Sequence, residues 1–390
     1  MKVVYLIANI YRPGSGVIPP FFAGREKEIR VFQERLESTK RGLPSHLAII
    51  GDYATGKTVL LKKFDELAAK DCFTYTCIAG AESTPEFFTS LIRGMSLKMK
   101  ARFGETALKK LSGKISVSEL SVSVFGTGGA LKFESVGQAQ LSFKEYLMQL
   151  WEEIGDKSKA IIIFLDDLDT AEDFRNTMMT LRNAVMELGD SCKVMIVVSG
   201  TERLYEKMHE AHAPLVRFFE PLELENLAPD EARKAIMEPA KNAGKEYDEA
   251  VVEKIVQYCA GQPYYLQEIC YHIFEVSEGK RIGMAEFELG FDAAFSDIVK
   301  LMIERKVSGL SKSEMKLLSF FEPKKAMTFT DIVEVASGSK MKKSTATTSL
   351  NRLNKKGFVK KIGLGQDKGK YLVKDSMILI FLKKTASWNQ

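Results

Sequence analysis

The sequence of 390 residues has few cysteines and few histidines, and both shortages restrict what the protein can be. Its five cysteines form no CxxC pair and lie within apolar stretches, so we expect reduced thiols in hydrophobic cores rather than a disulfide framework. Among the four histidines, His209 and His212 could share a helix face, but no cysteine or carboxylate stands near them at metal-ligand spacing. We therefore expect no structural metal.

Long hydrophobic runs are also missing. No apolar stretch reaches the roughly 18 residues that span a bilayer, and the apolar opening at residues 3–10 is short and lacks a signal-peptide cleavage site. We expect a cytoplasmic protein without a membrane partner. Hydrophobic residues make up 45% of the chain and charged residues 27%, which is ordinary for a globular protein of two or three domains.

Positive charge is concentrated near the end of the chain. Residues 306–390 contain 18 Lys and Arg against 6 Asp and Glu, a balance of +12. The remaining residues carry 38 against 45, a balance of −7. A basic tail on an acidic body indicates a polyanionic partner for the tail, although many basic domains bind no nucleic acid.

Short apolar runs alternate with segments of helical periodicity in the first part of the chain. The runs occupy residues 47–50, 73–79, 161–165 and 194–198, with a weaker one at 219–224. Buried strands that alternate with helices predict an α/β fold with a parallel sheet. Between the second and third runs, residues 115–134 alternate in polarity before a group of glycines, which predicts an inserted β-hairpin.

After residue 227 the pattern is wholly helical, with expected helices at 230–243, 249–260, 264–276 and 284–303. The tail then shows three helices, at 313–321, 329–336 and 344–355, and a ribbon at 358–374 with a glycine-rich turn. Three helices and a two-stranded ribbon predict a winged helix-turn-helix. We therefore predict a P-loop core at 1–228, an all-helical lid at 229–304 and a winged-helix domain at 305–390.

A phosphate-binding motif follows the first predicted strand. Residues 51–58, GDYATGKT, form a complete Walker A loop between a strand and an apolar-periodic helix. Its glycines let backbone N–H groups surround the phosphates, while Lys57 reaches the β and γ phosphates and Thr58 binds magnesium. The predicted nucleotide-binding residues of this segment are Gly51, Asp52, Tyr53, Ala54, Thr55, Gly56, Lys57, Thr58 and Val59.

A second acidic motif ends the third predicted strand. The apolar run 161–165 closes on Asp166 and Asp167, the pattern of a Walker B motif. Asp166 is expected to hold magnesium through water, and Asp167 to polarise the attacking water. Many such enzymes carry the longer glutamate at the second position, so we expect slow hydrolysis. The sequence thus predicts ATP or ADP and Mg²⁺ as ligands.

These motifs resemble those of AAA+ P-loop ATPases of the archaeal and bacterial type, related to replication-origin initiators and to signalling STAND ATPases. The resemblance covers nearly the whole chain and also rests on Arg12-Pro13-Gly14, Pro19-Pro20, Gly24-Arg25-Glu26, Ser199-Gly200-Thr201 and Gly261-Gln262-Pro263. It implies that Arg25 lies near the adenine and that Pro263 backs the nucleotide from the lid. It also implies that Ser199 or Thr201 senses the γ-phosphate.

Two further positions bear on this resemblance. Arg217 precedes the fifth predicted strand, where AAA+ proteins place an arginine finger for a neighbouring subunit, so the resemblance implies a homo-oligomer. An ordinary surface arginine is the alternative. Tyr264 and Tyr265 follow Pro263, and no arginine occupies the usual second-sensor position. This departure from initiators favours the STAND-like interpretation.

The tail carries the residues that could contact DNA. Apolar Ala346, Leu350 and Leu353 predict the buried face of the helix 344–355. The residues expected to contact DNA, on the outward face and in the wing, are Ser344, Thr348, Asn351, Arg352, Lys355, Lys368 and Lys370.

Two functions stay open. One is a slow ATPase whose nucleotide state switches DNA binding through the winged helix. The other is a STAND-like signalling or scaffold ATPase whose winged helix docks a protein.

Overall fold

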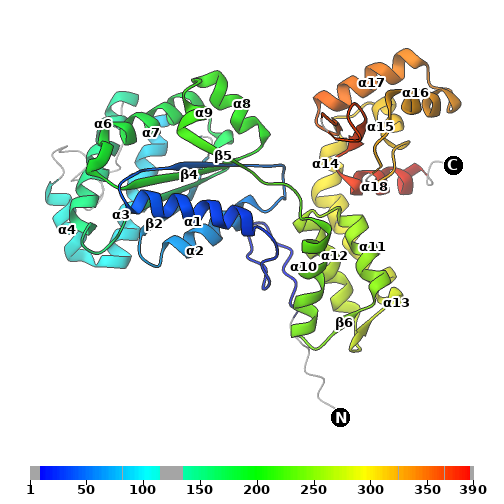
Figure 1. Cartoon of the computed structure of the whole chain (residues 1–390), viewed down its shortest axis with the longest axis horizontal. Helices are drawn as coiled ribbons and strands as arrows, with labels where there is room; N and C mark the ends of the chain where they lie inside the picture. The colour runs from blue at the N-terminus through cyan, green and yellow to red at the C-terminus, as the bar shows by residue number, and fades with distance from the viewer. Residues whose placement is uncertain (1–8, 81, 115–134, 324, 364, 387–390) are drawn as a thin grey trace, which may run out of the picture. The chain divides into compact units, whose positions relative to one another are not determined.

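The computed structural model describes residues 9–80, 82–114, 135–323, 325–363 and 365–386. The predicted hairpin at 115–134 lies outside these ranges. The chain divides into two compact units (Figure 1). One is Arg25–Glu225, and the other combines Met1–Gly24 with Asn226–Gln390.

Five parallel strands form the core of the unit Arg25–Glu225, which confirms the predicted parallel α/β sheet. Their order across the sheet is β2-β3-β4-β1-β5. The strands are β1 His46–Ile50, β2 Phe73–Ile78, β3 Ile161–Asp166, β4 Val194–Gly200 and β5 Phe219–Glu223. Because all five run in one direction, the carboxyl ends of β1, β3 and β4 meet at the same edge.

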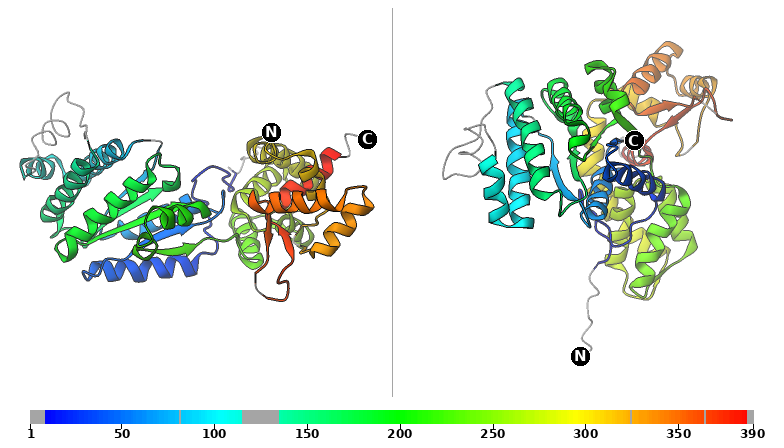
Figure 2. Two further views of the ribbon diagram at one scale, coloured as in Figure 1. Left: turned by 90° about the horizontal axis from the view of Figure 1, so that it is seen from above. Right: turned by 60° about the vertical axis from the view of Figure 1, so that its left-hand side comes forward.

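Helices cover both faces of this sheet (Figure 2). On one face, the Phe32 ring of α1 stacks on that of Phe64 in α2 at 4.1 Å and lies against Phe164 of β3. On the other, Ile163 and Leu165 join an apolar cluster with α3, α6 and α7. Successive side chains of a strand point to opposite faces, so an entirely apolar strand such as β3 requires helices on both.

The helices of this unit lie mostly between the strands, as the alternating pattern predicted. They are α1 Glu26–Lys40, α2 Lys57–Ala68, α3 Thr84–Phe103, α4 Glu105–Lys114, α6 Val136–Ile154, α7 Phe174–Leu188, α8 Glu202–Ala211 and α9 Leu215–Phe218, with 3₁₀ turns η1 Leu168–Thr170 and η2 Gly189–Ser191.

The second unit begins with helices. They are α10 Pro229–Asn242, α11 Glu249–Cys259, α12 Pro263–Val276, α13 Met284–Ile298, the π-helical turn η3 Val299–Ile303 and α14 Glu304–Val307. Two strands of two residues, β6 Glu246–Tyr247 and β7 Arg281–Ile282, also pair in parallel here. The sequence pattern was wholly helical at this point, because a strand of two residues is too short to leave a period of its own.

The same unit continues into three helices and a hairpin, consistent with the predicted winged helix. These elements are α15 Lys312–Leu318, α16 Phe329–Gly338, α17 Lys343–Lys355, β8 Val359–Lys361, β9 Tyr371–Val373 and a final α18 Ser376–Ala386. Strands β8 and β9 pair antiparallel, as a wing requires. The sequence analysis did not predict α18.

Helix α18 packs the end of the chain against the helical region, by which we mean α10 to α14. Its Met377 and Leu379 belong to the same hydrophobic cluster as residues of α11 and α12. Just before it, Asp375 accepts hydrogen bonds from the Tyr265 hydroxyl at 2.8 Å and from the Lys306 ammonium at 2.7 Å. The predicted boundary at residues 304 and 305 therefore stays a prediction. Within the described ranges, no helix combines the length and apolarity needed to cross a membrane.

Candidate nucleotide-binding site

The Walker A loop lies at the carboxyl end of β1 and leads into α2. Gly51 has no room for a side chain: a Cβ there would approach the Leu224 carbonyl oxygen to 2.6 Å and Thr55 Oγ1 to 3.0 Å. Gly56 has φ 94, a left-handed conformation that glycine adopts without strain. The turn delivers the chain to the N-terminus of α2, where free backbone N–H groups attract an anion.

Lys57 turns back into this loop. Its ammonium donates to the carbonyl oxygens of Gly51 at 3.0 Å and Asp52 at 2.9 Å. Burial lowers its pKa, while the nearby Asp167 and Asp166 act in the opposite direction. Because the partners of the Lys57 ammonium are uncharged carbonyl oxygens, its positive charge is not neutralised by them. It can therefore pair with a phosphate group, and the loop fits a nucleotide.

The predicted magnesium ligands meet across the site. The Thr58 hydroxyl donates to Asp166 Oδ2 at 2.5 Å, which joins the start of α2 to the end of β3. Asp166 is buried, and its Oδ1 accepts a hydrogen bond from the Ser199 hydroxyl. A hydroxyl and a carboxylate in contact supply the hard oxygen ligands that Mg²⁺ prefers, so these residues fit the ion.

Asp167 has a different environment from Asp166. It adopts φ 52, and its backbone N–H faces Asp166 Oδ1 at 3.2 Å and Ser199 Oγ at 3.3 Å. The side chain is half-buried. Burial and the charge of Asp166 raise its pKa. A raised pKa makes the Asp167 carboxylate a better proton acceptor than an ordinary aspartate.

The two candidate sensors have different partners. Ser199, at the end of β4, bonds to Asp166 and is therefore joined to the magnesium ligands. Thr201 is joined to Asp169 instead: its N–H and its hydroxyl donate to Asp169 Oδ2, at 3.1 and 2.5 Å. Of the two, Ser199 lies in direct contact with the Walker B carboxylate.

The sequence analysis did not single out Asp169. It is buried, and its Oδ1 has no hydrogen-bond partner within the part of the chain that the structure describes. Gly200 lies close to it, since a Cβ on Gly200 would come within 2.7 Å of that oxygen. The sequence signal that could have identified Asp169 is its place as the third acidic residue in the run Asp166-Asp167-Leu168-Asp169.

The other residues predicted for this site lie around the loop. Arg25 is buried, and its Nη2 donates to the Thr55 carbonyl oxygen at 3.0 Å, so it braces the backbone of the Walker A loop. Tyr53 and Asp52 are exposed on the loop, and Val59 lies in the first turn of α2. Pro263 opens α12 in the other unit, and its role behind the nucleotide stays a prediction.

Arg217 lies at the amino-terminal end of the strands, whereas the Walker A loop lies at their carboxyl end. It precedes β5, whose first residue, Phe219, pairs with His46 at the start of β1. At about 3.3 Å per residue, the five residues of β1 place this end roughly 15 Å from the Walker A loop. Arg217 is exposed, and its guanidinium makes no hydrogen bond or ion pair with any described residue, while its backbone N–H donates to the Pro214 carbonyl oxygen at 3.1 Å. As a finger, it could act only on the nucleotide of another copy.

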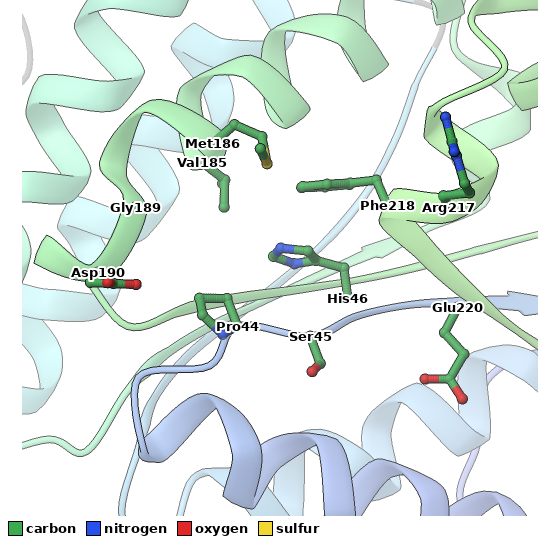
Figure 3. Close-up of a pocket in the computed structure, with 10 residues that line it drawn as sticks. All are labelled: Pro44, Ser45, His46, Val185, Met186, Gly189, Asp190, Arg217, Phe218 and Glu220. Carbon is green, nitrogen blue, oxygen red and sulfur yellow. The ribbon is translucent and has the colours of Figure 1, made fainter.

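A cavity of about 420 Å³ opens beside Arg217 and is separate from the nucleotide site (Figure 3). The imidazole of His46 lines it and stacks on the Phe218 ring at 4.2 Å. The backbone N–H of Ile196 donates to His46 Nδ1 at 3.0 Å. Burial lowers the pKa of His46 to about 3, so this imidazole is neutral.

The winged helix exposes the residues predicted to contact DNA. Ala346, Leu350 and Leu353 of α17 are buried, as expected. The exposed predicted residues of α17 and the wing are Ser344, Thr348, Asn351, Arg352, Lys355 and Lys368. Lys370 is partly buried and forms an ion pair with Asp367 at 2.6 Å.

Comparison with known protein families gives one match. Residues 22–198 match the family described as the AAA ATPase domain. The chain carries an AAA ATPase domain. The match spans the Walker A loop and both Walker B aspartates, and it ends beside Ser199. Arg217, the helical region and the winged helix follow the matched residues.

Solved structures resemble nearly the whole chain, beyond its AAA ATPase domain. The Walker-type ATPase PABY2304 of Pyrococcus abyssi has a TM-score of 0.58 at 16% identity, covering 93% of this chain and 96% of that protein. The Orc2 protein of Aeropyrum pernix, solved with ADPNP and ADP, has a TM-score of 0.57 at 14% identity, covering 97% and 98%. Cdc6p of Pyrobaculum aerophilum has a TM-score of 0.51 at 16% identity, covering 96% and 97%. At these identities the likeness shows a shared fold. Curated protein sequences give no significant match.

Proposed function

We propose that this protein binds ATP with magnesium, hydrolyses it slowly, and uses its nucleotide state to control DNA binding by the winged helix. The observation that carries the ATP part is the contact between Thr58 and Asp166. It joins the Walker A loop to the Walker B strand inside an AAA ATPase domain.

Each residue of the site has a role in this proposal. The Walker A backbone and Lys57 bind the phosphates, and Thr58 and Asp166 would hold Mg²⁺, which neutralises phosphate charge. Asp167 orients the attacking water and accepts its proton. Ser199 holds Asp166 in place and is the better placed of the two γ-phosphate sensors, because Thr201 bonds to Asp169.

Three observations support DNA as the ligand of the tail. Residues 306–390 carry a balance of +12. The predicted DNA-contacting residues of α17 are exposed, whereas its Ala346, Leu350 and Leu353 are buried. A helix that presents such residues beside a hairpin has the arrangement of a winged-helix DNA reader.

The link between nucleotide and tail runs through the helical region. Tyr265, two residues after Pro263 in the lid motif, donates its hydroxyl to Asp375 at the start of α18. A nucleotide that moves the first turn of α12 would thereby move the end of the winged helix.

The same contact supports a second candidate function. Tyr265 stands near the position where initiators carry a sensing arginine, and its hydroxyl is already occupied by Asp375. The STAND-like alternative needs no such sensor. In it, the bound nucleotide stabilises one conformation of the protein, and the winged helix binds a protein partner.

ATP turnover of the complete chain, with and without duplex DNA, distinguishes the two. A DNA-switched ATPase should show slow turnover that changes when DNA is added, and Lys57→Ala should abolish it in both conditions. Lys63→Ala, on the same helix, is the matched control and should behave as the wild type. Turnover that duplex DNA leaves unchanged, together with no DNA binding, would reject the switch and favour the protein-docking candidate.

A further inference from the structure

Three potential metal ligands lie together on the two helices that pack most closely in the second unit. Glu268 and His272 are one turn apart on α12, and Asp297 lies near the end of α13. One ligand atom from each residue lies within 4.8 Å of the other two. No part of the proposed ATPase chemistry uses these residues.

Two distances within this cluster are close to those between ligands of one tetrahedral ion, and the third pair of ligand atoms lies within 4.8 Å. His272 Nε2 lies 3.4 Å from Glu268 Oε1 and 3.1 Å from Asp297 Oδ2. Zinc bonds of about 2.0 to 2.1 Å at tetrahedral angles place neighbouring ligand atoms roughly 3.3 to 3.4 Å apart. An ion could therefore take all three atoms with little movement of the side chains.

The charges of the cluster are not balanced by the protein. No lysine or arginine among the described residues forms an ion pair with Glu268 or Asp297. The cluster holds two carboxylates and one imidazole, and one imidazole nitrogen has at most a single proton to share between two carboxylates. Glu268 is 6% exposed, and a carboxylate removed from water in this way is stabilised by a cation nearby.

The surroundings also suit a bound ion. Tyr264 lies one turn before Glu268 on α12, where its hydroxyl could act as an outer partner that orients this ligand. Asp297 is 49% exposed, which leaves the cluster open to solvent on one side. An ion could enter there, and water could complete its coordination.

We propose that Glu268, His272 and Asp297 form a site for a divalent transition metal of the zinc class, with water as the remaining ligand. One imidazole and two carboxylates suit zinc or cobalt better than magnesium, which takes oxygen ligands and retains its water. The ion joins α12 to α13 just after the lid motif. The expectation of no structural metal rested on the cysteines and on His209 and His212, and not on this cluster.

The test is metal binding by the complete, nucleotide-free protein, titrated with Zn²⁺ and with Co²⁺. Wild type should bind one ion more than Asp297→Asn or His272→Ala, and Co²⁺ at this site should give the visible absorption of a cobalt site that contains imidazole. His209→Ala, which removes an exposed histidine of the other unit, is the matched control and should retain the ion. Tyr264→Phe should weaken binding by about 10-fold, because it removes only an outer partner.

Thermal unfolding supplies a readout that does not depend on counting ions. Zn²⁺ should raise the melting temperature of the wild type and of His209→Ala, and should leave Asp297→Asn unchanged, since a ligand stabilises only the state that binds it. Asp297 is half-exposed, so its amide variant should fold normally. Equal Zn²⁺ binding by wild type and Asp297→Asn, with equal melting shifts, would overturn the proposal and leave an ordinary hydrogen-bonded cluster around His272.

Discussion

At the scale of single residues, the two Walker B aspartates differ in burial and in partners. Asp166 is buried and bonded to the Thr58 and Ser199 hydroxyls, an arrangement that suits a metal ligand. Asp167 is half-buried, and its pKa is raised by burial and by the neighbouring charge. We therefore propose separate tasks for these adjacent residues, because Asp166 lies buried at the end of β3 and Asp167 follows in a left-handed turn.

Replacement of Asp167 by asparagine tests this division of tasks. Asp167→Asn keeps the shape of the side chain and removes its ability to accept a proton, so ATP turnover should fall by about 100-fold or more. ATP binding, measured by titration with a fluorescent nucleotide, should be retained. Asp190→Asn, at an exposed turn, is the control. Full turnover in Asp167→Asn would transfer the role of base to another residue.

His46 makes a second prediction possible, because its pKa is lowered to about 3 by burial alone. The unfolded chain takes up a proton at His46 below about pH 6.5, whereas the folded protein does not do so until about pH 3. Stability should therefore fall as the pH decreases through this window, by up to about 1.4 kcal/mol per pH unit. Glu220, in the same cavity, is paired with Arg35 and offers no compensation.

Denaturant unfolding of the wild type and of His46→Asn at pH 7 and pH 5 measures this contribution. Asparagine can accept the hydrogen bond from Ile196 and does not titrate, so the variant should lose less stability between the two pH values. The comparison uses the pH dependence and not the absolute stability, since the stack on Phe218 is lost as well. Identical pH dependence in both proteins would contradict this prediction, because it would mean that His46 binds its proton equally in the folded and the unfolded chain.

At the scale of elements, the Walker A loop depends on close backbone packing between β1 and the end of β5. Gly51 lies where a Cβ would meet the Leu224 carbonyl oxygen at 2.6 Å, and backbone cannot move aside as a flexible side chain can. We expect Gly51→Ala to distort the loop at a cost of about 1 to 3 kcal/mol in stability. Nucleotide affinity should fall with it.

The matched control is Gly137→Ala in α6, where an added Cβ meets nothing within 4 Å. This variant should be neutral or slightly more stable, because alanine favours a helix over glycine. Melting temperatures and nucleotide titrations of both variants check the comparison. If Gly51→Ala binds nucleotide as the wild type does, the loop backbone can shift to accept a side chain. The close approach of Gly51 to the Leu224 carbonyl would then not be needed for nucleotide binding.

At the scale of the whole molecule, Arg217 can complete a nucleotide site only between copies. It lies at the edge of the sheet opposite the Walker A loop, so the two belong to different faces of the AAA ATPase unit. As a finger, Arg217→Ala should lower turnover by about 10³-fold and leave ATP affinity unchanged. Mixing Arg217→Ala with Asp167→Asn should then restore turnover, because an assembly can pair an intact site with an intact finger. Normal turnover in Arg217→Ala would make it an ordinary surface arginine.

DNA binding should involve the complete chain, because α18 of the winged helix shares a hydrophobic cluster with the helical region. With about four to six phosphate contacts, the logarithm of affinity should decrease against the logarithm of salt with a slope of about −4 to −5. The exposed pair Lys355→Ala with Lys368→Ala should flatten this slope by about 1.8. Lys109→Ala with Lys110→Ala removes the same charge from α4 and should leave it unchanged. Binding that does not depend on salt would reject DNA as the partner.

The sequence by itself determined the five strands of the parallel sheet, the Walker A loop and the acidic pair after β3. These features are local: an apolar run marks a buried strand, and a glycine spacing marks a turn around phosphate, whatever the rest of the chain does. The same holds for α17, whose buried residues Ala346, Leu350 and Leu353 are recognisable from helical spacing alone. The hairpin predicted at 115–134 lies outside the described residues.

Tertiary structure alone decided which distant residues meet. The sheet order β2-β3-β4-β1-β5 places Ser199 against Asp166, Thr201 against Asp169, and Arg217 at the far edge. The hydrophobic periodicity of the sequence does not specify this strand order, because the order depends on how the helices that connect the strands pack against the sheet. The contact of Tyr265 with Asp375, 110 residues apart, and the meeting of α12 with α13 arise in the same way. Residue spacing predicts which side chains share a helix face, and only packing decides which helix lies opposite.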